Sequence, residues 1–214
     1  TVGRALDSVV LEKSRAAATN TVQSVSPEFQ SILDGELLAD GHIRCYRDKD
    51  PTSGGTFRYT TANGAYRDWL SARFEQEGFE TNCGQNEDDA YKNGVRYRFQ
   101  SLTYDWLGDQ WERWYDDGKR LPTDFELTPL TLRHAFIGDG TVSNKNILLY
   151  TMSYHPREVR RLVEMLESAG IKATRQDSTN SIYIRRSSHS DFYEYMAPLP
   201  TELSDVYGYK WRSD

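Results

Sequence analysis

Apolar and polar residues alternate along this chain with two different periods, one typical of helices and one typical of strands. Apolar residues at helical spacing, bounded by capping residues and glycines, predict helices over 26–41, 66–79, 103–115, 127–140, 158–171 and 189–196. Period-two runs bounded by turn residues predict strands over 42–47, 56–60, 81–83, 95–100, 141–143, 146–151, 171–176 and 181–186. The chain is therefore predicted to mix helices with antiparallel strands.

The same order of elements occurs twice. The helices at 66–79 and 158–171 both end at a glycine, and Leu70, Phe74 and Gly78 have counterparts 92 residues later. The helices at 26–41 and 127–140 both open with Ser-Pro or Thr-Pro and close with Asp-Gly. Each half reads α-β-β-α-β-β-α, which predicts an α+β fold of two duplicated units with a pseudo-two-fold axis and with helices on one face of each antiparallel sheet. The predicted divisions are a lead at 1–25, which is helical or partly disordered, a first repeat at 26–118, a connector at 119–127 and a second repeat at 128–214.

Composition limits the class of protein. Of 214 residues, 37% are hydrophobic and 13% aromatic, which is enough to fold, and no apolar run reaches the ~20 residues of a membrane span. Two cysteines are too few for a disulfide framework. We therefore expect a soluble protein in a reducing compartment that does not contact a membrane.

The net charge of −6 argues at first against a nucleic-acid partner, because phosphates are neutralised by lysine and arginine. The charge is unevenly distributed, however. Residues 41–60 hold four basic and two acidic residues, and residues 171–190 hold four basic and one acidic, whereas residues 104–126 hold three basic and seven acidic. The predicted strands are thus basic beside an acidic connecting segment, and we expect weak binding to random DNA at moderate salt.

Two nine-residue segments carry the chemical signal. Residues 33–41 resemble the LAGLIDADG motif, and residues 132–140 resemble a second, degenerate copy. The matches are Leu33, Gly35, Ala39, Asp40 and Gly41 in the first and Leu132, Asp139 and Gly140 in the second. The segments Trp114-Tyr115, Gly118 to Pro122, Leu127 to Leu130 and Tyr207 to Trp211 also resemble elements of LAGLIDADG homing endonucleases with two repeats in one chain. The resemblance covers about residues 27–211.

The motif residues suit two helices packed side by side. Gly35 and Ala39 lie four apart on one helix face, and Gly138 is a small residue on the other helix. Asp40 and Asp139 would then lie at adjacent helix C-termini, where each following glycine can adopt the left-handed conformation that ends a helix. Two carboxylates at two negative dipole ends need a hard divalent cation. Asp34 and Glu36 are expected to face solvent or the neighbouring repeat.

The resemblance implies a function for these residues. Asp40 and Asp139 would coordinate Mg²⁺, for which Mn²⁺ or Ca²⁺ can substitute in binding, with the backbone of Ala39 and Gly138 as further ligands. Lys119 and Lys210 would be the basic residues of the two active sites, with Arg120 as the fallback for Lys119. The family cuts both strands of a long asymmetric DNA target, which implies a monomeric, magnesium-dependent endonuclease, either free-standing or intron-encoded.

Strand alternation predicts which side chains meet the DNA. In each strand one set of side chains faces the helices and the core, and the other faces outward. The predicted DNA-binding residues are Arg44, Tyr46, Arg58, Arg96, Arg98, Gln100, Lys172, Tyr183 and Arg185. Arginine and glutamine can read guanine and adenine edges in a major groove.

Two other functions remain open. The first is a nucleic-acid binder on the same fold that does not cleave, namely an RNA maturase or a transcription regulator. The second is a duplicated protein-interaction module without affinity for nucleic acid. Because both Asp40 and Asp139 are present, the sequence favours the enzyme.

Overall fold

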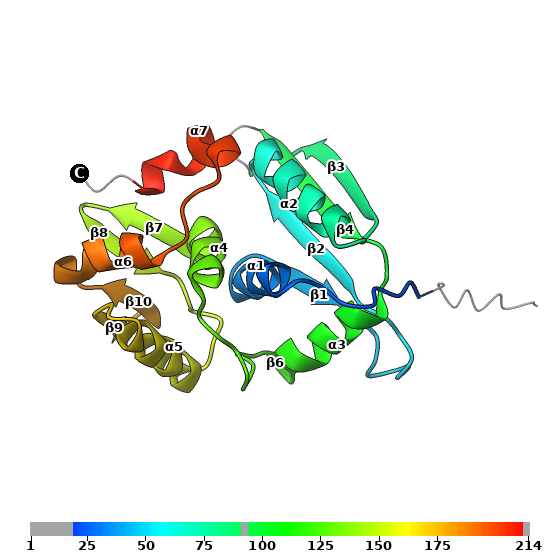
Figure 1. The fold of residues 1–214 in the computed structure, drawn as a ribbon, viewed down its shortest axis with the longest axis horizontal. Coiled ribbons are helices and arrows are strands. Elements are labelled where there is room, and N and C mark those ends of the chain that lie inside the picture. Colours follow the sequence, from blue (N-terminus) through cyan, green and yellow to red (C-terminus); the bar gives the residue numbers. More distant parts are fainter. Residues whose placement is uncertain (1–18, 91–93, 212–214) are drawn as a thin grey trace, which may run out of the picture.

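A computed structural model describes residues 19–90 and 94–211, in which two four-stranded antiparallel sheets lie on either side of a central helix pair (Figure 1). The first half contains α1 (Pro27–Leu38), β1 (His42–Arg44), β2 (Thr56–Thr61), α2 (Gly64–Gln76), β3 (Thr81–Glu87), β4 (Val95–Ser101) and α3 (Asp105–Trp114). The second half contains α4 (Pro129–Asp139), β7 (Gly140–Ser143), β8 (Asn146–Leu149), α5 (Pro156–Ser168), β9 (Ala173–Gln176), β10 (Ser181–Ile184) and α6 (His189–Tyr195). Short helical turns follow: Thr201–Leu203, α7 (Ser204–Tyr207) and Gly208–Trp211.

The two sheets have the same topology. Their strand orders are β1-β2-β4-β3 and β7-β8-β10-β9, and all pairs are antiparallel. In the first sheet His42 pairs with Arg58, one residue after the motif glycine Gly41, and in the second sheet the motif glycine Gly140 itself pairs with Leu149. The predicted α+β duplication is confirmed.

Helices α1 and α4 lie next to each other at the centre of Figure 1, each between the other helix and its own sheet. Both begin as the sequence predicts. The side chain of Ser26 accepts a hydrogen bond from the backbone N–H of Phe29, Thr128 does the same for Thr131, and proline occupies the first turn of both helices. Both helices are buried on several sides, so that every residue from Ile32 to Leu38 and from Thr131 to Ile137 is buried, charged and polar side chains included.

The sheets are apolar on the helix side and polar on the other. Phe57, Tyr59 and Phe99 are buried under α2 in the first sheet, and Ile147, Ile182 and Ile184 are buried in the second. The predicted alternation is therefore correct: Arg44 and Arg98 are exposed on strands whose neighbouring residues are buried.

Several boundaries differ from the prediction. β1 ends at Arg44, because the chain then enters the turns of residues 47–52, and β3 extends to Glu87, so much of the expected loop belongs to a long hairpin. A small hairpin of β5 (Tyr115–Asp116) and β6 (Gly118–Lys119) was not anticipated. Most of the predicted lead at 1–25 lies outside the described residues.

The expected role of the motif glycines in ending the helices was wrong. Gly41 and Gly140 do not have positive φ angles, whereas Gly78 and Gly170 do, at 88° and 84°. Gly41 and Gly140 are required by close packing instead. A Cβ at Gly41 would lie 2.9 Å from the Phe57 ring, and one at Gly140 would lie 2.4 Å from the carbonyl oxygen of Phe136.

Among residues 19–90 and 94–211, no helix is long and apolar enough to cross a membrane. Both cysteines are free; Cys45 is buried and Cys83 is exposed on β3.

Candidate active site at the ends of the central helices

The contact between α1 and α4 depends on glycines: where one helix has a glycine, the other helix places a side chain. Gly35 lies against His134, and a Cβ at position 35 would come within 2.5 Å of the His134 Cβ and 2.6 Å of the Thr131 carbonyl oxygen. One turn further along, a Cβ at Gly138 would lie 2.7 Å from the Ala39 Cβ. The predicted interface residues therefore do lie in the helix interface, and each glycine allows the side chain opposite it to fit.

This packing brings Asp40 and Asp139 to neighbouring helix ends. A Cβ at Gly138 would be 3.4 Å from the Asp40 carboxylate, so the end of α1 lies directly beside the last turn of α4. Burial and the charge of Asp40 raise the pKa of Asp139 to about 6. Burial, and next the charge of Glu36, also raise the pKa of Asp40, although its side chain is open to solvent. The charge of Asp40 thus destabilises the charged form of Asp139, and a cation between the two carboxylates would relieve this repulsion.

Lys119 lies on β6 and reaches the end of α1. Its Nζ donates hydrogen bonds of 3.0 Å to the carbonyl oxygens of Ala39 and Gly41, on either side of Asp40. Burial lowers its pKa to about 8, while Asp139 and Asp40 act in the opposite direction. The carbonyl of Ala39, expected as a metal ligand, is therefore already engaged by Lys119.

Lys210 binds the end of α4 in a similar way, and its contact with Gly140 is the equivalent of the contact between Lys119 and Gly41. Its Nζ donates to the carbonyl oxygens of Phe136, Ile137 and Gly140 at 3.1, 2.7 and 2.7 Å, and burial lowers its pKa to about 8. Both predicted lysines thus approach the predicted aspartates from opposite sides. Arg120 does not; it pairs with Asp116 on the exposed face of the β5–β6 hairpin.

The sequence analysis missed Tyr154, which follows β8. Its buried hydroxyl donates to the carbonyl oxygens of Leu37 and Leu38 at 3.0 and 3.1 Å, so the second half supplies a donor to the last turn of α1. No pattern in the sequence marks this tyrosine, because it lies in a loop and its partners are backbone atoms of a distant segment.

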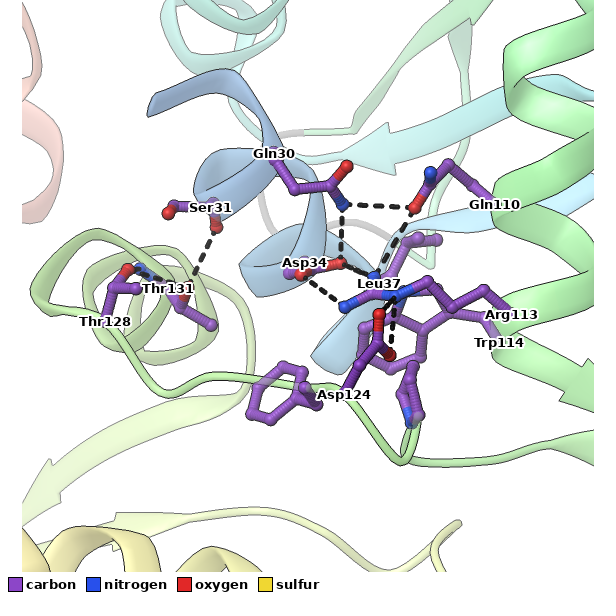
Figure 2. Close-up of polar contacts among 12 residues, drawn as sticks. Gln30, Ser31, Asp34, Leu37, Gln110, Arg113, Trp114, Asp124, Thr128 and Thr131 are labelled. Carbon is purple, nitrogen blue, oxygen red and sulfur yellow. Dashed lines mark hydrogen bonds and ion pairs between the residues drawn. The ribbon is translucent and has the colours of Figure 1, made fainter. Parts of the chain in front are cut away.

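Asp34 and Glu36 are both buried, and they point in different directions. Asp34 faces α3 of its own repeat, where Arg113 approaches at 2.5 Å and the indole N–H of Trp114 at 3.0 Å (Figure 2). It faces neither solvent nor the second repeat, so that expectation was wrong for Asp34. Glu36 does face the neighbouring repeat, with its carboxylate 2.7 Å from Nδ1 of His134.

The outer sheet face of the first half forms two adjoining grooves. Arg44, Tyr46, Arg58 and Gln100 line one, and Arg58, Arg98 and Gln100 line the other together with Thr60 and Asn82. Arg96 is partly neutralised by Asp88, at 3.3 Å. In the second half Lys172 and Arg185 are exposed, and the hydroxyl of Tyr183 donates to Asn146. The predicted DNA-binding residues therefore share one side of each sheet.

The donor chemistry at the helix ends suits a hard divalent cation. The candidate ligands are two carboxylates whose charges repel each other, and oxygen ligands are those that Mg²⁺ prefers. Within the described ranges, no third histidine, cysteine, aspartate or glutamate joins them as a ligand set. A cation held by Asp40 and Asp139 alone would keep most of its coordination positions open to a substrate.

Comparison with known proteins agrees with the fold. Residues 30–192 match the LAGLIDADG DNA endonuclease family. The homing endonuclease I-WcaI bound to its DNA recognition sequence has a similar structure, with a TM-score of 0.73, 17% sequence identity, and coverage of 91% of this chain and 89% of that one. I-DmoI in complex with DNA and Mn is similar with a TM-score of 0.53 and 11% identity over 80% of this chain and 98% of the other. These structures show the fold alone.

A two-repeat α+β fold with paired aspartates at the ends of its central helices defines a single-chain LAGLIDADG protein. The chain belongs to the LAGLIDADG DNA endonuclease family. Among curated proteins, the cytochrome b mRNA maturase bI2 of Debaryomyces hansenii is 27% identical over 171 residues, which is 75% of this chain. The match spans 64% of that relative's length.

Proposed function

We propose that this protein is a site-specific endonuclease that cuts both strands of a long asymmetric DNA target by hydrolysing phosphodiester bonds. The observation that carries the proposal is the site at the helix ends, where Asp40 and Asp139 are adjacent and each helix end is held by a lysine, half-buried at Lys119 and buried at Lys210. Two carboxylates beside two lysines can both hold a cation and stabilise a charged phosphate.

Asp40 and Asp139 would hold the Mg²⁺, which supplies Lewis-acid stabilisation of the scissile phosphate and lowers the pKa of bound water. The part of the protein is to position these groups. Lys119 and Lys210 hold the carbonyl oxygens around the aspartates and keep positive charge beside the phosphates, while burial lowers their pKa values to about 8. The sheet faces bind the flanking duplex and fix its register.

We further propose that the active species is a monomer. The two central helices, α1 and α4, belong to one chain and are in direct contact. The two halves differ in sequence, so the target need not be palindromic. Light scattering during gel filtration should give the mass of a single chain both with and without DNA.

The decisive experiment uses DNA that joins the sequences flanking the protein's own gene, with MgCl₂, and compares the wild type with Asp40→Asn and Asp139→Asn. We expect the wild type to produce a double-strand break and each variant to lose at least about 1000-fold in rate. With Ca²⁺ in place of Mg²⁺, both variants should still bind the same DNA. Cleavage that survives both substitutions would contradict the catalytic assignment.

A second candidate function is assistance of intron splicing, because the relative from Debaryomyces hansenii is an mRNA maturase. It predicts tight binding to the intron RNA and faster splicing in vitro. The same preparation should therefore be tested on the intron transcript. Splicing that is unaffected by Asp40→Asn, together with intact DNA, would favour the maturase.

A further inference from the structure

A buried chain of polar side chains crosses the helix interface one turn away from the aspartates. Glu36 of α1 lies 2.7 Å from Nδ1 of His134 of α4, and both side chains are almost fully buried. The hydroxyl of Tyr66, from α2, donates to the same Glu36 oxygen. Arg133 lies 3.1 Å from the other ring nitrogen, Nε2 of His134, and its Nη1 donates to the carbonyl of Pro198. We refer to Tyr66, Glu36, His134 and Arg133 as the interface relay.

The partners assign the protons of the relay. An arginine can only donate, so Nε2 of His134 accepts and the ring proton lies on Nδ1, where it can be donated to Glu36. The histidine is neutral, since burial and the charge of Arg133 hold its pKa well below the usual range. The hydrogen bond that joins α1 to α4 within the relay therefore runs from Nδ1 of His134 to a carboxyl oxygen of Glu36.

The relay holds the helices in one relative position because the residues around it are closely packed. His134 can occupy the interface only where Gly35 has no side chain, and the next contact, Ala39 against Gly138, reverses the arrangement. A shift of either helix along its axis would break the Glu36 to His134 contact and bring His134 into the backbone of α1. Glu36 is four residues before Asp40, and His134 is five before Asp139.

Energetics also argue that the relay has a role other than stability. Burial raises the pKa of Glu36 to about 8, even though the hydroxyl of Tyr66 and the charge of Arg133 act against that rise. Buried polar groups of this kind are often no more stabilising than apolar side chains of the same volume, but they do restrict the geometry of an interface.

We propose that Glu36 and His134 are positioning residues, whose hydrogen bond across the interface sets the separation of Asp40 and Asp139. This proposal rests on the proposed function only for its effect on cleavage. The geometric effect can be measured without metal or DNA.

The first test is disulfide cross-linking of the two helix ends. In a full-length Asp40→Cys, Asp139→Cys, Cys83→Ser background, the rate of disulfide formation reports how the two positions meet. Adding Glu36→Leu, which removes the acceptor, should slow cross-linking about tenfold. Adding Glu36→Gln, which keeps an acceptor oxygen at the same place, should leave the rate within about threefold.

Asp34→Asn is the matched control. It also alters a buried carboxyl group of α1, but the partners of that group lie on α1 and α3 rather than on α4 (Figure 2). It should lower the melting temperature and leave the cross-linking rate within about threefold. If Asp34→Asn slows cross-linking as much as Glu36→Leu, or if Glu36→Leu has no effect, the proposal is wrong.

The same comparison can be made from α4 and in the active protein. His134→Asn places an amide N–H where Nδ1 lies and should behave like the wild type, whereas His134→Ala should not; this pair decides the question if Glu36→Leu fails to fold. With native aspartates, Glu36→Leu should cut DNA about 30-fold more slowly while binding it normally in Ca²⁺. Failure of the wild type to cut any DNA would contradict the proposed function and leave the cross-linking result standing.

Discussion

The two halves of the molecule are similar at the ends of α1 and α4, where they are in contact, and differ in their sheets, which are proposed to bind DNA. At the helix ends, each half contributes one aspartate, one lysine and backbone carbonyls in equivalent positions. Away from the axis, β2, β3 and β4 have six to seven residues each, whereas β7 to β10 have four each. Under the proposed function, the shared centre is constrained by its chemistry, and the sheets are free to diverge because each would face a different stretch of the target.

The lysines offer the strongest test of this equivalence. Lys119→Met and Lys210→Met should each reduce cleavage about 100-fold, because both remove a positive charge beside the aspartates. Single-turnover rates on a cognate duplex would measure this. Lys210→Met should in addition lower the melting temperature more, since Lys210 is the more buried and satisfies three carbonyl groups rather than two. If Lys119→Met lowered the melting temperature more than Lys210→Met does, this prediction would be wrong.

The two interface glycines should respond unequally. Gly35→Ala forces a methyl group against the backbone carbonyl of Thr131 and should cost about 2–3 kcal/mol of unfolding free energy. Gly138→Ala has its one close contact within 3 Å with the methyl group of Ala39, while the Asp40 carboxylate lies 3.4 Å away, and it should cost about 1 kcal/mol. Urea denaturation of both variants would measure the difference. Equal losses of unfolding free energy would show that the helices can move apart as easily at Gly35 as at Gly138.

Metal affinity should depend on pH through the aspartates. Because the pKa of Asp139 is raised to about 6, this carboxyl binds a proton more readily than an ordinary aspartate, and protons compete with the cation below that pH. The affinity for Mn²⁺ should therefore be nearly constant from pH 7 upward and fall about tenfold per pH unit below about 6. Titration of Mn²⁺ by electron paramagnetic resonance would test this, with Asp139→Asn as the control that lacks the transition.

The smallest expected effects concern the sheet faces. Arg58→Ala or Arg98→Ala in the first half should weaken binding of the cognate duplex about tenfold, because these arginines line the grooves beside Gln100. Arg185→Ala in the second half should weaken it about threefold, since Arg185 donates to Thr174 at the exposed edge of a shorter strand. Equilibrium binding in Ca²⁺ would rank them. If Arg185→Ala weakened binding more than Arg58→Ala or Arg98→Ala, the second half would contribute more to affinity than the first, contrary to this prediction.

The elements near the active site could be predicted because their signals are local. A cap, a proline, an apolar run and Asp-Gly define α1 and α4, and alternation sorts the strand faces, so the structure brings the four predicted residues Asp40, Asp139, Lys119 and Lys210 to one place.

The interface relay and Tyr154 could not be predicted, because their partners come from other elements and depend on how the helices rotate about their axes. One signal was available: when the two motif copies are aligned, His134 occupies the position of the motif glycine Gly35. The misread glycines have a similar cause. Gly41 and Gly140 follow helices as cap residues do, and only the tertiary packing shows that they are needed for space.

The order of the two lysines along the chain has a consequence for synthesis. Lys119 precedes α4 in the chain, so Asp40 and Lys119 leave the ribosome before α4 does. Lys210, in contrast, follows every strand of the second repeat and closes over α4 from a late segment. A nascent chain that already exposes both sheets would therefore lack its second lysine, so the proposed DNA-binding faces would form before the proposed cleavage site is complete.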